Sequence, residues 1–225
     1  MGLGEVQKDD QLQALRNTKS GRLFVIGNGP SLMEQVDLMP QMNKEDTFVV
    51  NNFFRKYQPF TPTYYAANFV EWKEKRIDPV PGPSYVISGL RFFLNSGPFT
   101  DTPGWIQVQK DRSNANVGVL GLGETVLTTI PTCATSPYVM AQLGGWMGYD
   151  EIYFLGCEQT NGYWYDKTAH RPHANWLDRI NGKSWAILKE QYTKAGKEIW
   201  DCTPNGLLNG LLGYKPLEEV LSGTT

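Results

Sequence analysis

The sequence predicts an α/β fold in which a mostly parallel sheet is flanked by helices. Short apolar runs that suit buried strands alternate with segments of helical periodicity along most of the 225 residues. Polar residues directly follow several of these runs, where parallel strands end at a ligand cleft. A glycine-rich turn joins the first run to the helical segment after it. These three observations favour a doubly wound sheet with a binding site beyond the carboxyl ends of its strands.

The turn after the first strand is the most informative stretch. Residues 23–26 form an apolar run that stops at Gly27-Asn28-Gly29, where two glycines allow a sharp turn and a close approach to a ligand. Pro30 fixes φ near the helical value just before Ser31, so a helix is expected to begin here. Free N–H groups at such a start favour a phosphate, while a tight connection without any ligand is the alternative interpretation. Leu32 stands where the dinucleotide fingerprint needs a third glycine, which excludes that motif.

The rest of the chain is expected to continue the alternation. Ser136 and Pro137 suit the N-cap and first position of one helix, and Gly148 suits the residue that ends it. Between residues 89 and 122 the periodicity fails, and only short β pieces at 106–109 and 117–120 are expected. Further strands are expected at residues 47–50, 63–67, 85–88, 151–155 and 198–201, and further helices at 69–76, 137–147, 184–195 and 216–221.

The chain is expected to form a single domain over residues 21–225, preceded by a flexible lead-in over residues 1–20 with a short helix around residues 10–16. Residues 159–179 form a polar, aromatic-rich loop that holds both histidines of the chain. A loop of this length favours a functional lid, which we expect within residues 157–180.

Composition excludes several classes of partner. The net charge is −2, so no basic footprint for nucleic acid is present. Three cysteines, far apart and without a Cys-x-x-Cys pair, indicate reduced and mostly buried thiols in a cytoplasmic protein. No apolar run reaches the length of a membrane span, and the first residues lack the apolar core of a secretion signal.

Polar residues at the predicted strand ends indicate where ligands bind. Because the carboxyl ends of parallel strands meet at one edge of a sheet, these residues are expected to share one rim. The strand ends are Gly27-Asn28-Gly29, Asn51-Asn52, Asn68, Gly156-Cys157-Glu158 and the corner from Asp201 to Pro204.

Several segments form a pattern when taken in order. They are Gly27-Asn-Gly-Pro-Ser-Leu32, Asn51-Asn52-Phe53, Thr135-Ser136, Gly148-Tyr-Asp-Glu-Ile-Tyr-Phe-Leu-Gly156, Tyr163 and Tyr165 followed by a histidine, and Pro204-Asn-Gly-Leu-Leu208. This pattern resembles the bacterial sialyltransferases that decorate lipooligosaccharide, over roughly residues 22–78 and 133–212. The Gly-x-Gly-Pro-Ser and Gly-Tyr-x-x-Ile-x-x-x-Gly pieces also occur in a wider set that includes glycosyltransferases attached to flagellar modification and the archaeal hydroxymethylpterin diphosphokinases.

The resemblance implies a Rossmann-like, GT-A-like domain with a lid. It implies a metal-independent, inverting glycosyltransferase that uses a CMP-linked nucleotide sugar and a glycan acceptor and needs no cofactor. The Asp-x-Asp metal motif, which the sialyltransferases lack, is also missing from this chain. By position, the resemblance implies that the donor nucleotide is bound by Gly27 and Gly29 in the turn, by Asn28 and Ser31 at its phosphate and ribose, by Asn51 and Asn68 at the nucleotide or its sugar, and by Gly156 beside its nucleobase. It implies that Thr135 and Ser136 bind the donor carboxylate. It also implies that Tyr163 and Tyr165 donate to the leaving phosphate and that His173, or alternatively His170, is the general base.

Each assignment has a structural alternative. The histidines are compatible with a surface loop, the two tyrosines with packing of the lid beside Trp164, and the asparagines with turn caps. Thr135-Ser136 caps a helix in either interpretation. Glu158 stands where the sialyltransferases commonly carry aspartate.

Two other functions stay open at this point. One is a hydroxymethylpterin diphosphokinase-like enzyme, which would need Mg²⁺ to transfer diphosphate from a nucleoside triphosphate. The other is a nucleotide-binding relative without turnover. The sequence also leaves open whether the chain forms a homo-oligomer.

Overall fold

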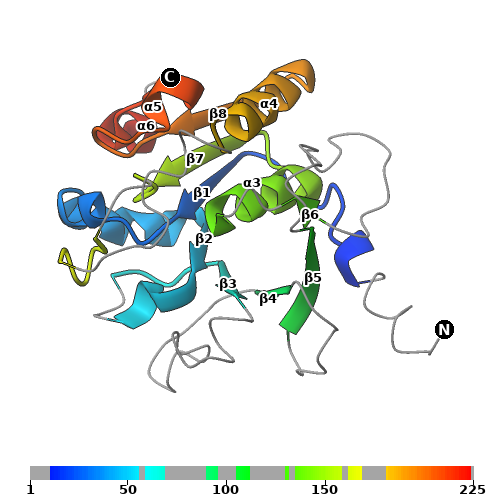
Figure 1. Ribbon diagram of the computed structural model, residues 1–225, viewed down its shortest axis with the longest axis horizontal. Helices are drawn as coiled ribbons and strands as arrows, with labels where there is room; N and C mark the ends of the chain where they lie inside the picture. Colours follow the sequence, from blue (N-terminus) through cyan, green and yellow to red (C-terminus); the bar gives the residue numbers. More distant parts are fainter. Residues whose placement is uncertain are drawn as a thin grey trace.

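The protein contains a parallel sheet flanked by helices, which confirms the predicted α/β class (Figure 1). The computed structural model describes residues 11–55, 59–68, 90–95, 105–111, 130–131, 135–158, 162–168 and 181–223. Within these residues eight strands pair in the order β6-β5-β4-β3-β2-β1-β7-β8, and every neighbouring pair is parallel. Their bounds are β1 Arg22–Ile26, β2 Asp46–Val50, β3 Tyr64–Asn68, β4 Arg91–Asn95, β5 Trp105–Asp111, β6 Ile130–Pro131, β7 Glu151–Leu155 and β8 Glu198–Asp201.

Helices cover both faces of the sheet, and Figure 1 shows α4, α5 and α6 gathered around the β8 end. The described 3₁₀ helices are η1 Pro30–Met33, η2 Val36–Lys44 and η3 Asn51–Arg55. The described α-helices are α3 Ser136–Met147, α4 Asn181–Lys194, α5 Asn209–Leu212 and α6 Leu217–Ser222.

Alternating side chains of the strands form two separate cores. In β1, Leu23 and Val25 pack into the core that also contains residues of α3, α4 and α5. Phe24 and Ile26 point to the other face, where η1, η2 and α6 supply the covering residues. Each of these four side chains is fully buried and contributes about 1.5–3 kcal/mol to folding. Because both faces of β1 are buried, its sequence is a continuous apolar run and not an alternation of apolar and polar residues.

The strand order reverses beside β1. The chain leaves β1 for β2 and β3 on one side and returns later to β7 and β8 on the other. In open α/β sheets, ligands bind at such a topological switch point, outside the carboxyl ends of the two strands that flank it. In this sheet that region, called the crevice below, lies beyond β1 and β7, where the glycine turn follows β1.

α3 runs from the carboxyl edge of the sheet back to the amino edge. Gly148 ends it with a φ of 110°, as the sequence predicts. Lys197 Nζ, just before β8, donates to the carbonyl oxygens of Gly148 and Tyr149 at 2.8 and 2.7 Å. Since the helix has 12 residues and rises 1.5 Å per residue, its first turn lies about 18 Å away, toward the carboxyl edge.

Most predicted elements match the structure within one to three residues, and several others differ. The segment after the glycine turn is a pair of 3₁₀ helices, and Pro40 inside η2 lacks the N–H that an α-helix would use. α3 begins at Ser136, so its N-cap is Thr135 and not Ser136. The elements β4, β6, η3 and α5 were not predicted. The helix at 69–76, the strands at 85–88 and 117–120, and residues 1–10 lie outside the described residues.

The segment before β1 contacts the end of α3. Leu12 is buried in the core, and its carbonyl oxygen accepts a hydrogen bond from Trp146 Nε1 at 3.0 Å. The backbone N–H of Lys19 donates to Met147 O at 2.8 Å. The division into lead-in, single domain and lid stays a prediction.

Candidate functional site

The turn after β1 lies directly against the end of β7. The backbone N–H of Gly27 donates to Leu155 O, and that of Gly29 donates to Gly156 O, both at 2.8 Å. A Cβ atom on Gly27 would lie 2.3 Å from Gly156 O, which no side chain tolerates. The glycines at 27 and 29 therefore have a role in packing two strand ends together, in addition to the ligand approach that the sequence predicts.

A carboxylate from the other side of the crevice fills part of this turn. Glu158 Oε1 accepts a hydrogen bond from the backbone N–H of Ser31 at 2.5 Å. A Cβ atom on Gly29 would lie 1.3 Å from Glu158 Oε2, so the carboxylate rests on the bare backbone there. Glu158 is only 6% exposed. The sequence places Glu158 among the polar residues at the strand ends and as a departure from the sialyltransferases, but it does not predict the contact with Ser31.

A second buried carboxylate, Asp201, follows at the end of β8. It is fully buried, and its Oδ1 accepts a hydrogen bond from the backbone N–H of Thr203 at 2.9 Å. Burial raises the pKa of Asp201 to about 7, and the charge of Glu158 adds to this rise, whereas the hydrogen bonds from Thr203 oppose it. Glu158 Oε2 and Asp201 Oδ2 have no hydrogen-bond partner among the described residues. The crevice is therefore acidic.

The end of β2 reaches the same turn. The side-chain amide of Asn28 donates from Nδ2 to Val50 O at 2.9 Å, which places Asn28 beside Asn51. Asn51 adopts a left-handed φ of 51°, and its carbonyl oxygen accepts a hydrogen bond from Tyr65 OH at 2.9 Å. An asparagine tolerates this conformation better than most residues, so Asn51 forms the corner between β2 and η3.

Residues 162–168 dock onto the turn through Trp164. Its backbone N–H donates to Asn28 O at 3.0 Å, and its ring, 2% exposed, lies 5.8 Å from the ring of Phe53 between centroids. Tyr163 and Tyr165 flank it in sequence and stack on each other with centroids 5.1 Å apart and an interplanar angle of 6°. Both tyrosines are half-buried. The contact between Trp164 and Asn28 thus brings the two tyrosines to the rim of the crevice.

The structure brings most of the predicted site residues to one edge of the sheet. Thr135 and Ser136 lie at the start of α3, which points to this edge, and the backbone of Asn68 ends β3 there. His170 and His173 lie outside the described residues. The residues whose contacts converge on the crevice are Gly27, Asn28, Gly29, Ser31, Asn51, Gly156, Tyr163 and Tyr165.

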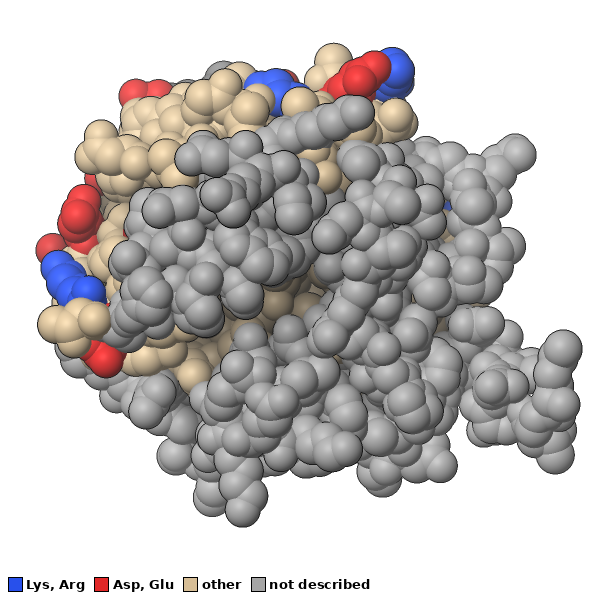
Figure 2. All heavy atoms as spheres, in the orientation of Figure 1, with Lys and Arg blue, Asp and Glu red and all other residues tan. Residues whose placement is uncertain are grey.

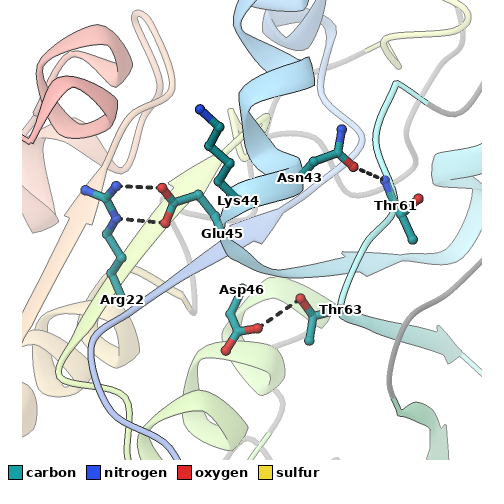
Figure 3. Close-up of a pocket in the computed structure, with 7 residues that line it drawn as sticks. All are labelled: Arg22, Asn43, Lys44, Glu45, Asp46, Thr61 and Thr63. Atoms are coloured by element: carbon teal, nitrogen blue, oxygen red, sulfur yellow. Dashed lines mark hydrogen bonds and ion pairs between the residues drawn. The ribbon is translucent and has the colours of Figure 1, made fainter.

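A polar cavity of about 520 Å³ lies at the opposite, amino edge of the sheet. Figure 3 shows Arg22 and Glu45 facing each other, joined by two hydrogen bonds of 2.8 and 2.6 Å, and Asp46 facing Thr63, whereas Lys44 points away from them. Because Arg22 and Glu45 bind each other and Asp46 binds its neighbour Thr63, most charged groups of this cavity are engaged within the protein. Its lining residues are Arg22, Asn43, Lys44, Glu45, Asp46, Thr61 and Thr63.

Among the residues that the structure describes, no group of three or more histidine, cysteine, aspartate or glutamate side chains could hold a metal ion. Figure 2 shows acidic and basic side chains close together on the described surface of one face, without a large patch of one sign. Cys157 and Cys202 are buried and form no disulfide, as predicted, and Cys133 lies outside the described residues. None of the described helices has the length and apolarity that crossing a membrane requires.

Comparison with known proteins gives a similar fold. No protein-family model matches the chain, and no curated protein sequence matches it. Among solved structures, the chain is similar to the sialyltransferase CstII from Campylobacter jejuni in complex with a substrate analogue, cytidine-5'-monophosphate. The TM-score is 0.50 and the sequence identity 17%, over 87% of this chain and 85% of that chain. The two proteins therefore share an α/β fold over most of their length.

Proposed function

We propose that this protein is a metal-independent, inverting glycosyltransferase that takes its sugar from a CMP-linked donor. The observation that carries the proposal is that two segments, the end of β2 and residues 162–168, both contact Asn28 at the switch point of the sheet. Its side chain contacts the end of β2, and its carbonyl oxygen accepts from the segment that holds Tyr163 and Tyr165. The similarity to a sialyltransferase fold whose structure contains cytidine monophosphate supports the choice of nucleotide.

The proposed chemistry needs a base for the acceptor hydroxyl and donors for the departing phosphate. The hydroxyl groups of Tyr163 and Tyr165 lie on a segment docked beside the turn and are neutral donors for that phosphate. Each such donor lowers the barrier by about 2–4 kcal/mol in comparable sites. His173 is the base that the sequence favours, because an imidazole is largely neutral at physiological pH.

The buried acids give one reason to keep a second candidate. Mg²⁺ bound to a nucleoside triphosphate is held by one or two carboxylates together with phosphate oxygens. Glu158 and Asp201 have oxygens without partners at the crevice, which is compatible with a diphosphokinase-like transferase. Activity in the presence of a chelator separates the two candidates, because only the diphosphokinase chemistry requires the metal.

Substitution of the proposed base tests the main candidate. We expect His173→Ala to lower hydrolysis and transfer of CMP-sialic acid by about 10²–10⁴-fold at unchanged thermal stability, since general base catalysis contributes that range. His170→Ala tests the alternative base in the same loop, and it should keep most of the activity if His173 is the base. Full activity of His173→Ala would show that the base assignment is wrong. Binding of cytidine monophosphate without any turnover by the native chain would favour a non-catalytic relative.

A further inference from the structure

Glu158 places a negative charge inside the turn that is proposed to hold the nucleotide. We propose that Glu158 is a specificity-determining residue that restricts this turn to nucleotides carrying a single phosphate. The inference rests on the proposed function, because it concerns the same nucleotide site.

The carboxylate of Glu158 occupies an N–H group of the turn. The Ser31 N–H donates to Glu158 Oε1, and a carboxylate acceptor makes stronger hydrogen bonds than a neutral one. The other oxygen rests against Gly29, where no side chain keeps it away. The carboxylate thus occupies the position that an anionic ligand would take on this N–H group, so a phosphate has to compete with it.

The charge of the two buried acids has no compensating cation among the described residues. The ion pairs there join other groups, and none includes Glu158 or Asp201. Both acids are more than nine-tenths buried, and each keeps one oxygen without a hydrogen-bond partner. Repulsion between like charges grows as water is excluded, so each additional phosphate raises the cost of binding. A nucleoside monophosphate ester has the smallest charge that the turn could still hold.

The experiment compares the affinities of CMP, CDP and CTP by calorimetry, in EDTA and at constant ionic strength. For the native chain we expect the dissociation constant to rise by on the order of tenfold with each added phosphate. Glu158→Gln keeps an oxygen acceptor for Ser31 but loses the charge. In this variant the ratio of the dissociation constant for CTP to that for CMP should fall by at least about tenfold. Glu190→Gln is the matched control, because Glu190 is an exposed acid on α4 that pairs with Lys194. It should keep the native ratio.

A second variant separates the effect of the charge at position 158 from a folding defect. Glu158→Asp keeps the charge while shortening the side chain, and it should keep the discrimination; circular dichroism compares the folded content of all variants. The inference would be overturned if the native chain and Glu158→Gln had the same ratio of CTP to CMP dissociation constants. It would also be overturned if Glu158→Asp no longer bound CMP more tightly than CTP. If no cytidine nucleotide binds, the proposed function fails, and inorganic phosphate and pyrophosphate serve as probes. A preference for phosphate that disappears in Glu158→Gln then still supports the inference, and binding of neither anion overturns it.

Discussion

At the scale of single residues, Asp201 connects burial to a measurable pH dependence. Its carboxyl group is fully buried, accepts hydrogen bonds from Thr203, and forms no ion pair among the described residues. Burial raises its pKa from 3.8 to about 7, so the folded protein keeps a proton that the unfolded chain releases. The slope of the unfolding free energy with pH is proportional to this difference in bound protons, so stability falls as the pH rises wherever the folded state binds more protons. The contribution of Asp201 is therefore intact below pH 4 and is lost as the pH rises toward about 7.

We predict that Asp201→Asn removes the loss of stability that the native chain shows as the pH rises toward about 7. The amide stays neutral at every pH and keeps an oxygen for the Thr203 N–H. Relative to the native chain, the variant should gain on the order of 2 kcal/mol of unfolding free energy between pH 5 and pH 8, since one pKa unit corresponds to about 1.4 kcal/mol. Urea unfolding at a series of pH values measures the difference. Parallel pH profiles of the two proteins would contradict the raised pKa.

At the scale of elements, the segment 162–168 owes its position to one aromatic anchor. Trp164 is 2% exposed and packs with Phe53 and Tyr165 on the core face that η1 and η2 cover. The tyrosines beside it have no comparable burial. Loss of the anchor should therefore release both tyrosines from the rim of the crevice.

We predict that Trp164→Ala lowers the unfolding free energy by about 3–5 kcal/mol and weakens CMP binding by about tenfold or more. Trp185→Ala is the control, because Trp185 is equally buried but lies in the other core, against Tyr138 and Phe154. It should cost similar stability without a change in CMP affinity at a temperature where both variants are folded. The milder Trp164→Phe and Trp185→Phe pair repeats the comparison if either alanine variant unfolds. Equal effects of the two substitutions on CMP binding would show that Trp164 serves stability alone.

The predictability of each element follows from how local its determinants are. β7 and β8 were predicted with their observed bounds because each is a short apolar run between turn residues. β4 was missed although Phe92 and Leu94 alternate toward one core, because five residues between glycine and proline turns give a weak signal. The contact between Glu158 and Ser31 could not be predicted at all. It depends on the sheet order that puts β7 beside β1, which no local pattern encodes.

At the scale of the whole molecule, the two edges of the sheet differ in how their polar groups are paired. The amino edge is closed by paired groups: Tyr149 OH donates to Asp46 Oδ2, Tyr149 and Tyr64 share a hydrogen bond of 2.9 Å, and Thr63 Oγ1 donates to Asp46 at 3.1 Å. The carboxyl edge instead has the unpartnered oxygens of Glu158 and Asp201. Polar groups left unpaired inside a protein lower its stability, so their concentration at one edge indicates a site kept for a ligand.

This division predicts opposite outcomes for substitutions at the two edges. Tyr149→Phe removes one hydroxyl from the network at the amino edge and leaves Asp46 and Tyr64 each short of a partner. It should therefore lower the unfolding free energy by about 1–3 kcal/mol, since burial leaves those partners without full hydration. The affinity for CMP should stay within about twofold of the native value, because the network lies at the far end of the strands. Asn28→Ala, at the carboxyl edge, should weaken CMP binding by about tenfold, because its side chain joins the turn to the end of β2. Urea unfolding and calorimetry on both variants measure the two quantities, and a large change in CMP affinity in Tyr149→Phe would refute the division between a stabilising edge and a binding edge.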